Sequence, residues 1–204
     1  MPKNARSGFF EPGEIAAVLL ELPADARRDV VEFLRATGWR RDEGRLLQWA
    51  TVDMDAETVR LEEARSKSGK PCVFPFGLSP SLKELFAKRW AERDGLYVFH
   101  SDGRPIGVQA LRYAWKRATK RAGVPGRLIH DLRCGAARDF IEAGVDRADV
   151  KLLCGRETDS VFERYLIRNE ANLARAVAKR FNGKVAGKSE APPPSQDSLS
   201  SSAP

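Results

Sequence analysis

The stretch Leu128-Ile129-His130-Asp131-Leu132-Arg133, with Tyr165 further along the chain, is the most informative part of this sequence. His130 and Arg133 are three positions apart, so a helix that includes both projects them from neighbouring points on one face. Two donors placed in this way are suited to gripping one phosphate group. Alone, a His-x-x-Arg pair has a plainer interpretation, a helix start followed by a solvated arginine, because short motifs often occur by chance.

Further polar residues stand upstream in a fixed order. Arg40 follows Thr37-Gly38-Trp39, and Lys67 lies in a basic turn between two predicted strands. Taken singly, Arg40 can be a surface cation, Lys67 a solubilising turn residue and Tyr165 a half-buried aromatic with its hydroxyl outward. Their common order along the chain is therefore more informative than any one of them.

This ordered set resembles the tyrosine recombinase family of the phage-integrase type. Members of that family place an arginine after a Thr-Gly-aromatic turn, a lysine on a β-hairpin, a His-x-x-Arg pair and a late tyrosine. The match runs from about residue 4 to residue 181. The resemblance implies an α+β catalytic domain, mainly helical with a small antiparallel β-sheet. It also implies an enzyme of site-specific DNA recombination or integration.

The resemblance further implies a role for each residue of the set. Arg40 and Arg133 would bind the phosphate, and Tyr165 would attack it to give a 3′-phosphotyrosyl intermediate. Lys67 would protonate the leaving 5′ oxygen, and His130 would help to manage the tyrosine proton and the phosphate. Neither a metal ion nor a nucleotide cofactor is implied.

The sequence departs from the family pattern at several positions. Arg156 stands where members commonly have histidine or tryptophan, and Cys134-Gly135 replaces the Arg-Thr that often follows the motif arginine. An arginine can still donate to a phosphate oxygen but cannot accept a proton, so we expect reduced activity. We also expect the family's N-terminal core-binding domain to be absent. The alternatives are therefore a truncated, catalytically impaired integrase remnant that only binds DNA and, favoured by charge alone, an unrelated helical DNA-binding regulator.

Composition favours a polyanionic partner. The 204 residues include 35 Lys and Arg against 28 Asp and Glu, a formal net charge of +7. Double-stranded DNA is the leading candidate and an anionic membrane surface a weaker one. No stretch has the length of apolar residues that a membrane span requires, so we expect a cytoplasmic protein. The three cysteines form no Cys-x-x-Cys pair and are predicted to be buried free thiols.

The domain organisation follows from composition and periodicity. Residues 1–182 are predicted to form the catalytic domain, and the Pro- and Ser-rich residues 183–204 a disordered tail. Leu173, Val177 and Phe181 give the predicted helix 170–181 an apolar stripe for docking in cis or in trans. We expect tetramers only on paired DNA sites.

The remaining elements are read from hydrophobic period, caps and turns. Helices are predicted from Pro12 through Leu22, over 24–36 ending at Gly38, over 40–49, from Ser79-Pro80 onward, over 108–122, over 131–143, over 146–153 ending at Gly155, and over 159–165. Strands are predicted over 58–62, 72–76 and 96–99.

Overall fold

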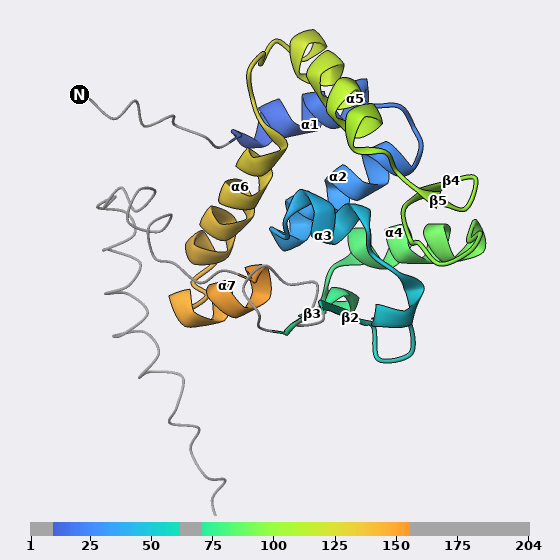
Figure 1. The fold of residues 1–204 in the computed structure, drawn as a ribbon. Coiled ribbons are helices and arrows are strands. Elements are labelled where there is room, and N and C mark those ends of the chain that lie inside the picture. Colours follow the sequence, from blue (N-terminus) through green and yellow to red (C-terminus); the bar gives the residue numbers. More distant parts are fainter. Residues whose placement is uncertain (1–9, 62–70, 156–204) are drawn as a thin grey trace, which may run out of the picture. The chain divides into compact units, whose positions relative to one another are not determined.

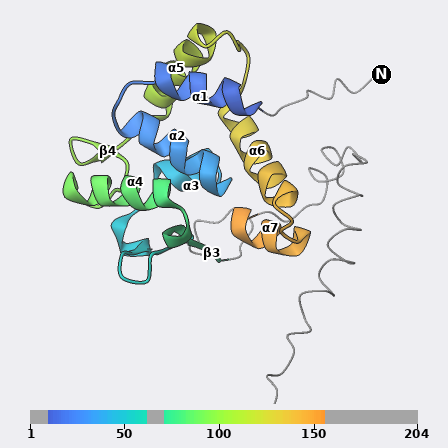
Figure 2. The same cartoon turned by 180° about the vertical axis from the view of Figure 1, so that it is seen from behind.

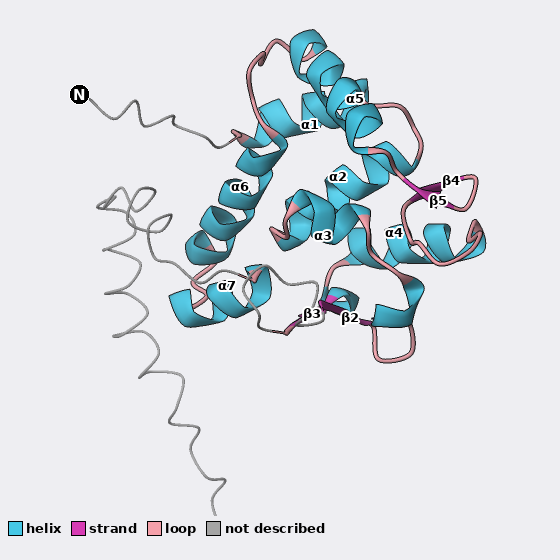
Figure 3. Ribbon diagram, viewed as in Figure 1, coloured by secondary structure: helices cyan, strands magenta, loops and turns pink. Residues whose placement is uncertain are grey.

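The computed structural model describes residues 10–61 and 71–155, which form a mainly helical assembly with small antiparallel sheets (Figures 1 and 3). The predicted residues Lys67, Arg156 and Tyr165, the helices 159–165 and 170–181, and the tail all lie outside these described ranges. The helices are α1 (Pro12–Glu21), α2 (Ala26–Thr37), α3 (Arg41–Arg45), α4 (Pro80–Ala91), α5 (Val108–Arg121), α6 (Ile129–Glu142) and α7 (Arg147–Cys154). The strands are β1 (Val52–Asp53), β2 (Thr58–Leu61), β3 (Cys72–Pro75), β4 (His100–Ser101) and β5 (Arg104–Pro105), with short 3-10 turns at Trp49–Thr51 and Phe76–Leu78.

The first two helices form close to the ranges predicted for them. The Asp25 carboxylate accepts the backbone N–H of Arg27 and so caps α2, and Gly38 ends this helix with a φ of 68°. A left-handed residue after the last turn is a common helix stop, and glycine adopts it without strain. Phe33 and Leu34 on α2 are almost completely buried, so this helix runs through the centre of the core.

A three-stranded antiparallel sheet with the order β1-β2-β3 lies beside the helices. Val59 pairs with Phe74, and Leu61 pairs with Cys72. Along β3 burial alternates, with Cys72 and Phe74 inward and Val73 and Pro75 outward, as a half-buried strand requires. The strand pair predicted around the basic turn is therefore confirmed.

Two predicted elements are wrong for one shared reason. The helix predicted over 40–49 ends at Arg45, and the strand predicted over 96–99 is replaced by a single antiparallel bridge between Gln48 and Tyr97. The Val98 N–H donates to the Leu47 carbonyl oxygen at 2.9 Å, and the Trp49 N–H donates to the Leu96 carbonyl oxygen at 3.0 Å. These long-range bonds flank Gln48 and hold it extended, so tertiary pairing overrides the local helical pattern.

The helices that follow α5 close the fold. α5 packs on α1, while α6 packs on α2 and α7 packs on both α6 and β3. Figure 2, the view from behind, shows α7 next to α6 and near β3. The helix predicted over 131–143 begins earlier, at Ile129, and therefore contains both His130 and Arg133. Among the described residues, no helix has the length and apolarity that a bilayer span requires.

Candidate active site

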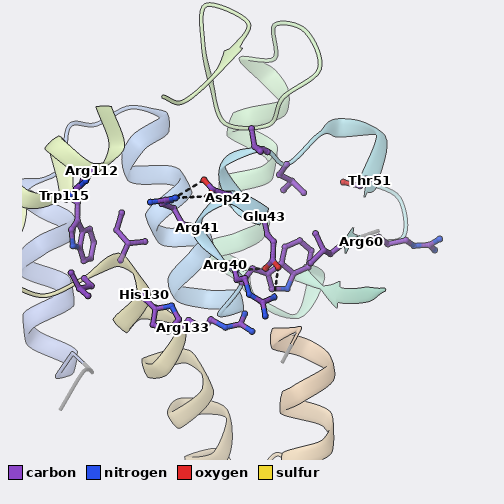
Figure 4. A pocket seen from close by; sticks show the side chains of 16 residues that line it. Arg40, Arg41, Asp42, Glu43, Thr51, Arg60, Arg112, Trp115, His130 and Arg133 are labelled. Carbon is purple, nitrogen blue, oxygen red and sulfur yellow. Dashed lines mark hydrogen bonds and ion pairs between the residues drawn. The ribbon is translucent and has the colours of Figure 1, made fainter. Parts of the chain in front are cut away.

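A cavity of about 810 Å³ is formed mainly by α3, α5, α6 and β2 (Figure 4). Its lining combines a cationic set with apolar side chains from the same elements. The lining arginines are Arg40, Arg41, Arg60, Arg112 and Arg133, which lie beside His130, and the apolar lining residues are Trp39, Leu46, Leu47, Leu61, Trp115, Leu128 and Ile129. Asp42, Glu43 and Thr51 complete it. Three of the predicted site residues, Arg40, His130 and Arg133, thus line one pocket although Arg40 is far from the other two in sequence.

Arg133 is a buried cation, only 4% exposed, on the inner face of α6. Its Nη1 donates to the carbonyl oxygens of Gly38, at 2.6 Å, and of Cys154. Its Nη2 donates to the carbonyl oxygen of Gly155 at 2.9 Å. The guanidinium therefore connects the turn before α3 with the end of α7, and its orientation is fixed from both sides.

Arg40 immediately precedes α3 and is held by a different set of partners. Its backbone N–H donates to Glu43 Oε2 at 2.6 Å, and its Nη1 donates to Glu43 Oε1 at 2.8 Å. The side chain of Glu43 is 5% exposed and that of Arg40 29% exposed. The ion pair thus has a buried carboxylate behind a cation that reaches the pocket (Figure 4).

The two arginines meet at one acceptor. Arg40 Nη1 lies 3.2 Å from the carbonyl oxygen of Gly155, the same oxygen that accepts from Arg133 Nη2. Gly155 has a φ of 61° and follows the last residue of α7. A helix C-terminus carries partial negative charge, which favours cations there. Two guanidinium groups therefore lie next to the end of α7, at one wall of the pocket.

His130 is the second residue of α6 and is exposed, whereas Arg133, one turn later, is buried. Both line the pocket, as expected for residues three apart on one helix (Figure 4). Asp131 stabilises this helix start by accepting the backbone N–H of Leu128 at 2.7 Å. The predicted arrangement of the His-x-x-Arg pair is therefore present.

Sequence reasoning did not single out several residues of the site. Glu43 orients Arg40, and its only signal in the sequence is its position three residues after that arginine. Arg60 on β2 adds positive charge to the lining. Asp42 pairs with Arg41 and Arg45, and the hydrogen bond from Arg41, followed by that from Arg45, holds the pKa of Asp42 below its usual value.

Two described residues of the site are sequence neighbours of segments that the structure does not describe. Leu61, which lines the cavity, precedes the segment that carries Lys67. Gly155, whose carbonyl oxygen both arginines contact, immediately precedes Arg156. Chemically, a pocket with oriented guanidinium groups and a histidine can bind a phosphate and stabilise added negative charge on its oxygens.

Comparison with known proteins gives matches over most of the chain. A model described as the phage integrase family matches residues 15–172. The integrase of Salmonella phage P22 is 30% identical over 175 residues, which are 80% of this chain and 44% of that relative. The chain therefore spans less than half of that relative's length.

Solved structures share the fold at lower identity. The catalytic domain of bacteriophage HP1 integrase has a TM-score of 0.61 at 18% identity, and the match covers 90% of this chain and 99% of that one. Lambda integrase, solved as a tetramer bound to a Holliday junction, has a TM-score of 0.63 at 21% identity, over 74% of this chain and 47% of that one. The α+β catalytic-domain fold, mainly helical with small antiparallel sheets, is thereby confirmed.

Proposed function

Because this chain belongs to the phage integrase family, we propose that it cleaves and rejoins double-stranded DNA through a covalent bond to Tyr165. The observation that carries the proposal is the meeting of Arg40 and Arg133 at the carbonyl oxygen of Gly155, in the wall of a pocket that His130 also lines. Arg40 is far from His130 and Arg133 in the sequence. A shared phosphate ligand gives a chemical reason for their convergence.

The reaction follows from the charges of the site. Attack on a phosphodiester places additional negative charge on the non-bridging oxygens, and fixed guanidinium groups stabilise that charge before it develops. Tyr165 Oη forms a bond to phosphorus while the bond from phosphorus to the 5′ oxygen breaks. Lys67 gives a proton to that leaving oxygen, and His130 helps to manage the tyrosine proton. Arg156 adds a donor to the phosphate.

Rejoining is the reverse displacement with a new strand. The 5′ hydroxyl of another DNA end attacks the phosphotyrosyl phosphorus, a phosphodiester forms, and the tyrosine oxygen leaves with a proton. The covalent intermediate keeps the energy of the broken phosphodiester bond in the phosphotyrosyl bond. The reaction therefore balances without nucleotide hydrolysis and without a metal-bound water.

The outer face of α5 supports DNA as the substrate. This helix contains no acidic residue, and its exposed side chains include Arg112, Lys116, Arg117 and Lys120 together with Tyr113. Arg112 also lines the pocket, so the basic face is continuous with the candidate site. Lysine and arginine side chains that neutralise backbone phosphates contribute affinity for DNA of any sequence, and they make binding dependent on salt concentration.

The proposal also covers the oligomeric state of the protein on DNA and the compartment in which it acts. Lambda integrase, which shares the fold, occurs as a tetramer on a Holliday junction, and we extend tetramer formation on paired DNA sites to this protein. Residues 1–182 would form the catalytic domain and 183–204 a tail outside it. We also propose that the protein acts on DNA in the cytoplasm.

A nicked suicide duplex tests the proposal, because loss of the short strand beyond the nick traps the covalent intermediate. The protein is incubated with a pool of candidate attachment sites, and protein-DNA adducts that resist denaturation are counted. We expect an adduct with the natural chain and none with Tyr165→Phe. Absence of adduct on DNA that the protein demonstrably binds, also after Arg156→His, would support the DNA-binding remnant instead.

A further inference from the structure

At the end of α7, four successive backbone carbonyl groups each accept a hydrogen bond from a side chain. A helix leaves its last four carbonyl groups without partners inside the helix. Here the Leu152 oxygen accepts the Cys72 thiol at 2.9 Å, and the Leu153 oxygen accepts the Trp39 indole N–H at 3.0 Å. The Cys154 oxygen accepts from Arg133, and the Gly155 oxygen accepts from both site arginines. The carbonyls that orient the arginines are therefore part of one bonded turn.

Three consecutive residues hold this turn against the start of α3. The Gly38 carbonyl accepts from Arg133, Trp39 donates to Leu153, and Arg40 donates to Gly155. Trp39 is the middle contact and is only 1% exposed. Its ring meets the Phe33 ring edge to face, with centroids 5.4 Å apart, so the indole has little freedom to turn.

We propose that Trp39 is a positioning residue, which fixes the end of α7 through Leu153 and thereby sets the guanidinium groups of Arg40 and Arg133. The consequence for catalysis rests on the proposed function, but the geometric part does not. Loss of the indole N–H lets the last turn of α7 move relative to Gly38 and Arg40. Both guanidinium groups follow it, because both are bonded to Gly155.

Cys72 supplies a partial replacement. Its sulfur lies 2.9 Å from the Leu152 oxygen and 3.1 Å from the Leu153 oxygen, but a thiol has only one proton to donate. When the indole N–H of Trp39 donates to Leu153, the Cys72 thiol donates to the Leu152 oxygen. Without the indole, the thiol can turn to Leu153, while Leu152 keeps the backbone N–H of Gly155. The loss of both donors is therefore expected to exceed the sum of the single losses.

The test compares Trp39→Phe with Trp49→Phe in the full chain. Phenylalanine at 39 keeps an aromatic ring against Phe33 and removes the N–H. Trp49 is the matched control, because its buried indole nitrogen has no hydrogen-bond partner in the described part of the chain and it lies outside the pocket lining. Two quantities are measured: the ¹⁵N side-chain signals of the arginines in the DNA-free protein, and the single-turnover cleavage rate beside the DNA dissociation constant.

We expect Trp39→Phe to shift the side-chain signals of both Arg40 and Arg133, and Trp49→Phe to shift neither. The cleavage rate should fall about fivefold, the loss of one hydrogen bond of roughly 1 kcal/mol at the transition state, with the dissociation constant changed less than about twofold. Unmoved arginine signals, or moved signals with an unchanged rate, overturn the proposal. If the natural chain forms no adduct, the proposed function fails, and the arginine signals alone decide this inference.

Cys72 variants provide a second route should Trp39→Phe fail to fold. Cys72→Ser keeps a one-proton donor at the same place, whereas Cys72→Ala removes it. We expect the arginine signals to move in Cys72→Ala and to return toward their natural positions in Cys72→Ser. Equal signals in the two variants would show that donors to α7 do not set the arginines.

Discussion

Arg40 and Glu43 form an ion pair with unequal exposure, since the carboxylate is buried and the guanidinium reaches the pocket. Removing only the cation leaves a buried carboxylate without its partner, which is costly. We expect Arg40→Gln to lower the free energy of unfolding by about 3 kcal/mol. The double variant Arg40→Gln/Glu43→Gln should recover at least about 1 kcal/mol of this loss, because no buried charge remains. Urea denaturation measures both, and a double variant less stable than the single one would contradict this account.

Neither of these variants should form the DNA adduct, since the phosphate loses one guanidinium in both. The pair thus separates two contributions of Arg40, one to stability and one to the reaction. Recovery of the adduct together with stability would mean that Arg40 has only a structural role.

Gly38 is required for both its conformation and its lack of a side chain. Its φ is 68°, and a Cβ at this position would lie 2.9 Å from Cys154 Sγ and 3.1 Å from Ala136 Cβ. We expect Gly38→Ala to cost about 2 to 4 kcal/mol, from backbone strain of about 1 kcal/mol plus displacement of α7. Gly123→Ala is the control, because its φ is 76° but no atom lies within 4 Å of the added Cβ. Equal losses of stability in the two variants would refute the packing argument.

Cys72 makes stability depend on alkaline pH. Burial raises the pKa of its thiol from 9.0 to about 11. The folded protein therefore keeps the proton longer than the unfolded chain does. The contribution to stability is full below pH 9 and is lost as the pH rises through 11. Between these values we expect the natural chain to lose roughly 2 to 3 kcal/mol more than Cys72→Ala. Parallel denaturation curves of the two proteins against pH would contradict the assignment.

At the residue scale, the ordered set of motifs was sufficient to predict that Arg40, His130 and Arg133 lie together, and all three line one pocket. It was insufficient for their partners. Arg133 is oriented by backbone carbonyls of Gly38, Cys154 and Gly155, and every residue has a carbonyl, so no pattern of residue types marks these acceptors.

Among the elements, α5 presents a face whose charge can be tested separately from the site. Lys116 and Lys120 are both exposed. If each neutralises one backbone phosphate, Lys116→Gln/Lys120→Gln should lower the slope of log K against log salt concentration by about 1.8. The charge-matched control is Lys83→Gln/Arg104→Gln, with residues on α4 and β5 outside the pocket lining. An unchanged slope in the α5 variant, measured by fluorescence anisotropy, would remove α5 from the DNA interface.

Elements defined by a local signal were predictable. The Gly38 stop of α2 and the Gly155 stop of α7 agree with the prediction, whereas Asp25 and Asp146, predicted inside these helices, cap them instead. α3 was predicted too long because contacts with residues distant in the sequence determine where it ends. Gly44 packs so closely on Leu34 that a Cβ would lie 2.8 Å from its Cδ2, and the following residues bond to the segment 96–98.

At the scale of the whole molecule, the chain has the catalytic-domain fold, and its match to the P22 relative covers 44% of that relative. The proposed nucleophile, Tyr165, is one of three tyrosines in the chain. Tyr113 is 66% exposed on α5, and Tyr97 takes part in the bridge with Gln48. Neither residue is among those that line the pocket. The attached residue therefore distinguishes a recombinase mechanism from adventitious coupling.

The most direct measurement is to digest the trapped protein-DNA adduct with trypsin and nuclease and to locate the remaining nucleotide by mass spectrometry. The account predicts a nucleotide 3′-phosphate on the peptide that begins at Tyr165, directly after Arg164. It also predicts that Arg133→Ala, which removes a guanidinium from the pocket, abolishes this peptide. A nucleotide attached to Tyr97, Tyr113 or any other side chain would contradict the account.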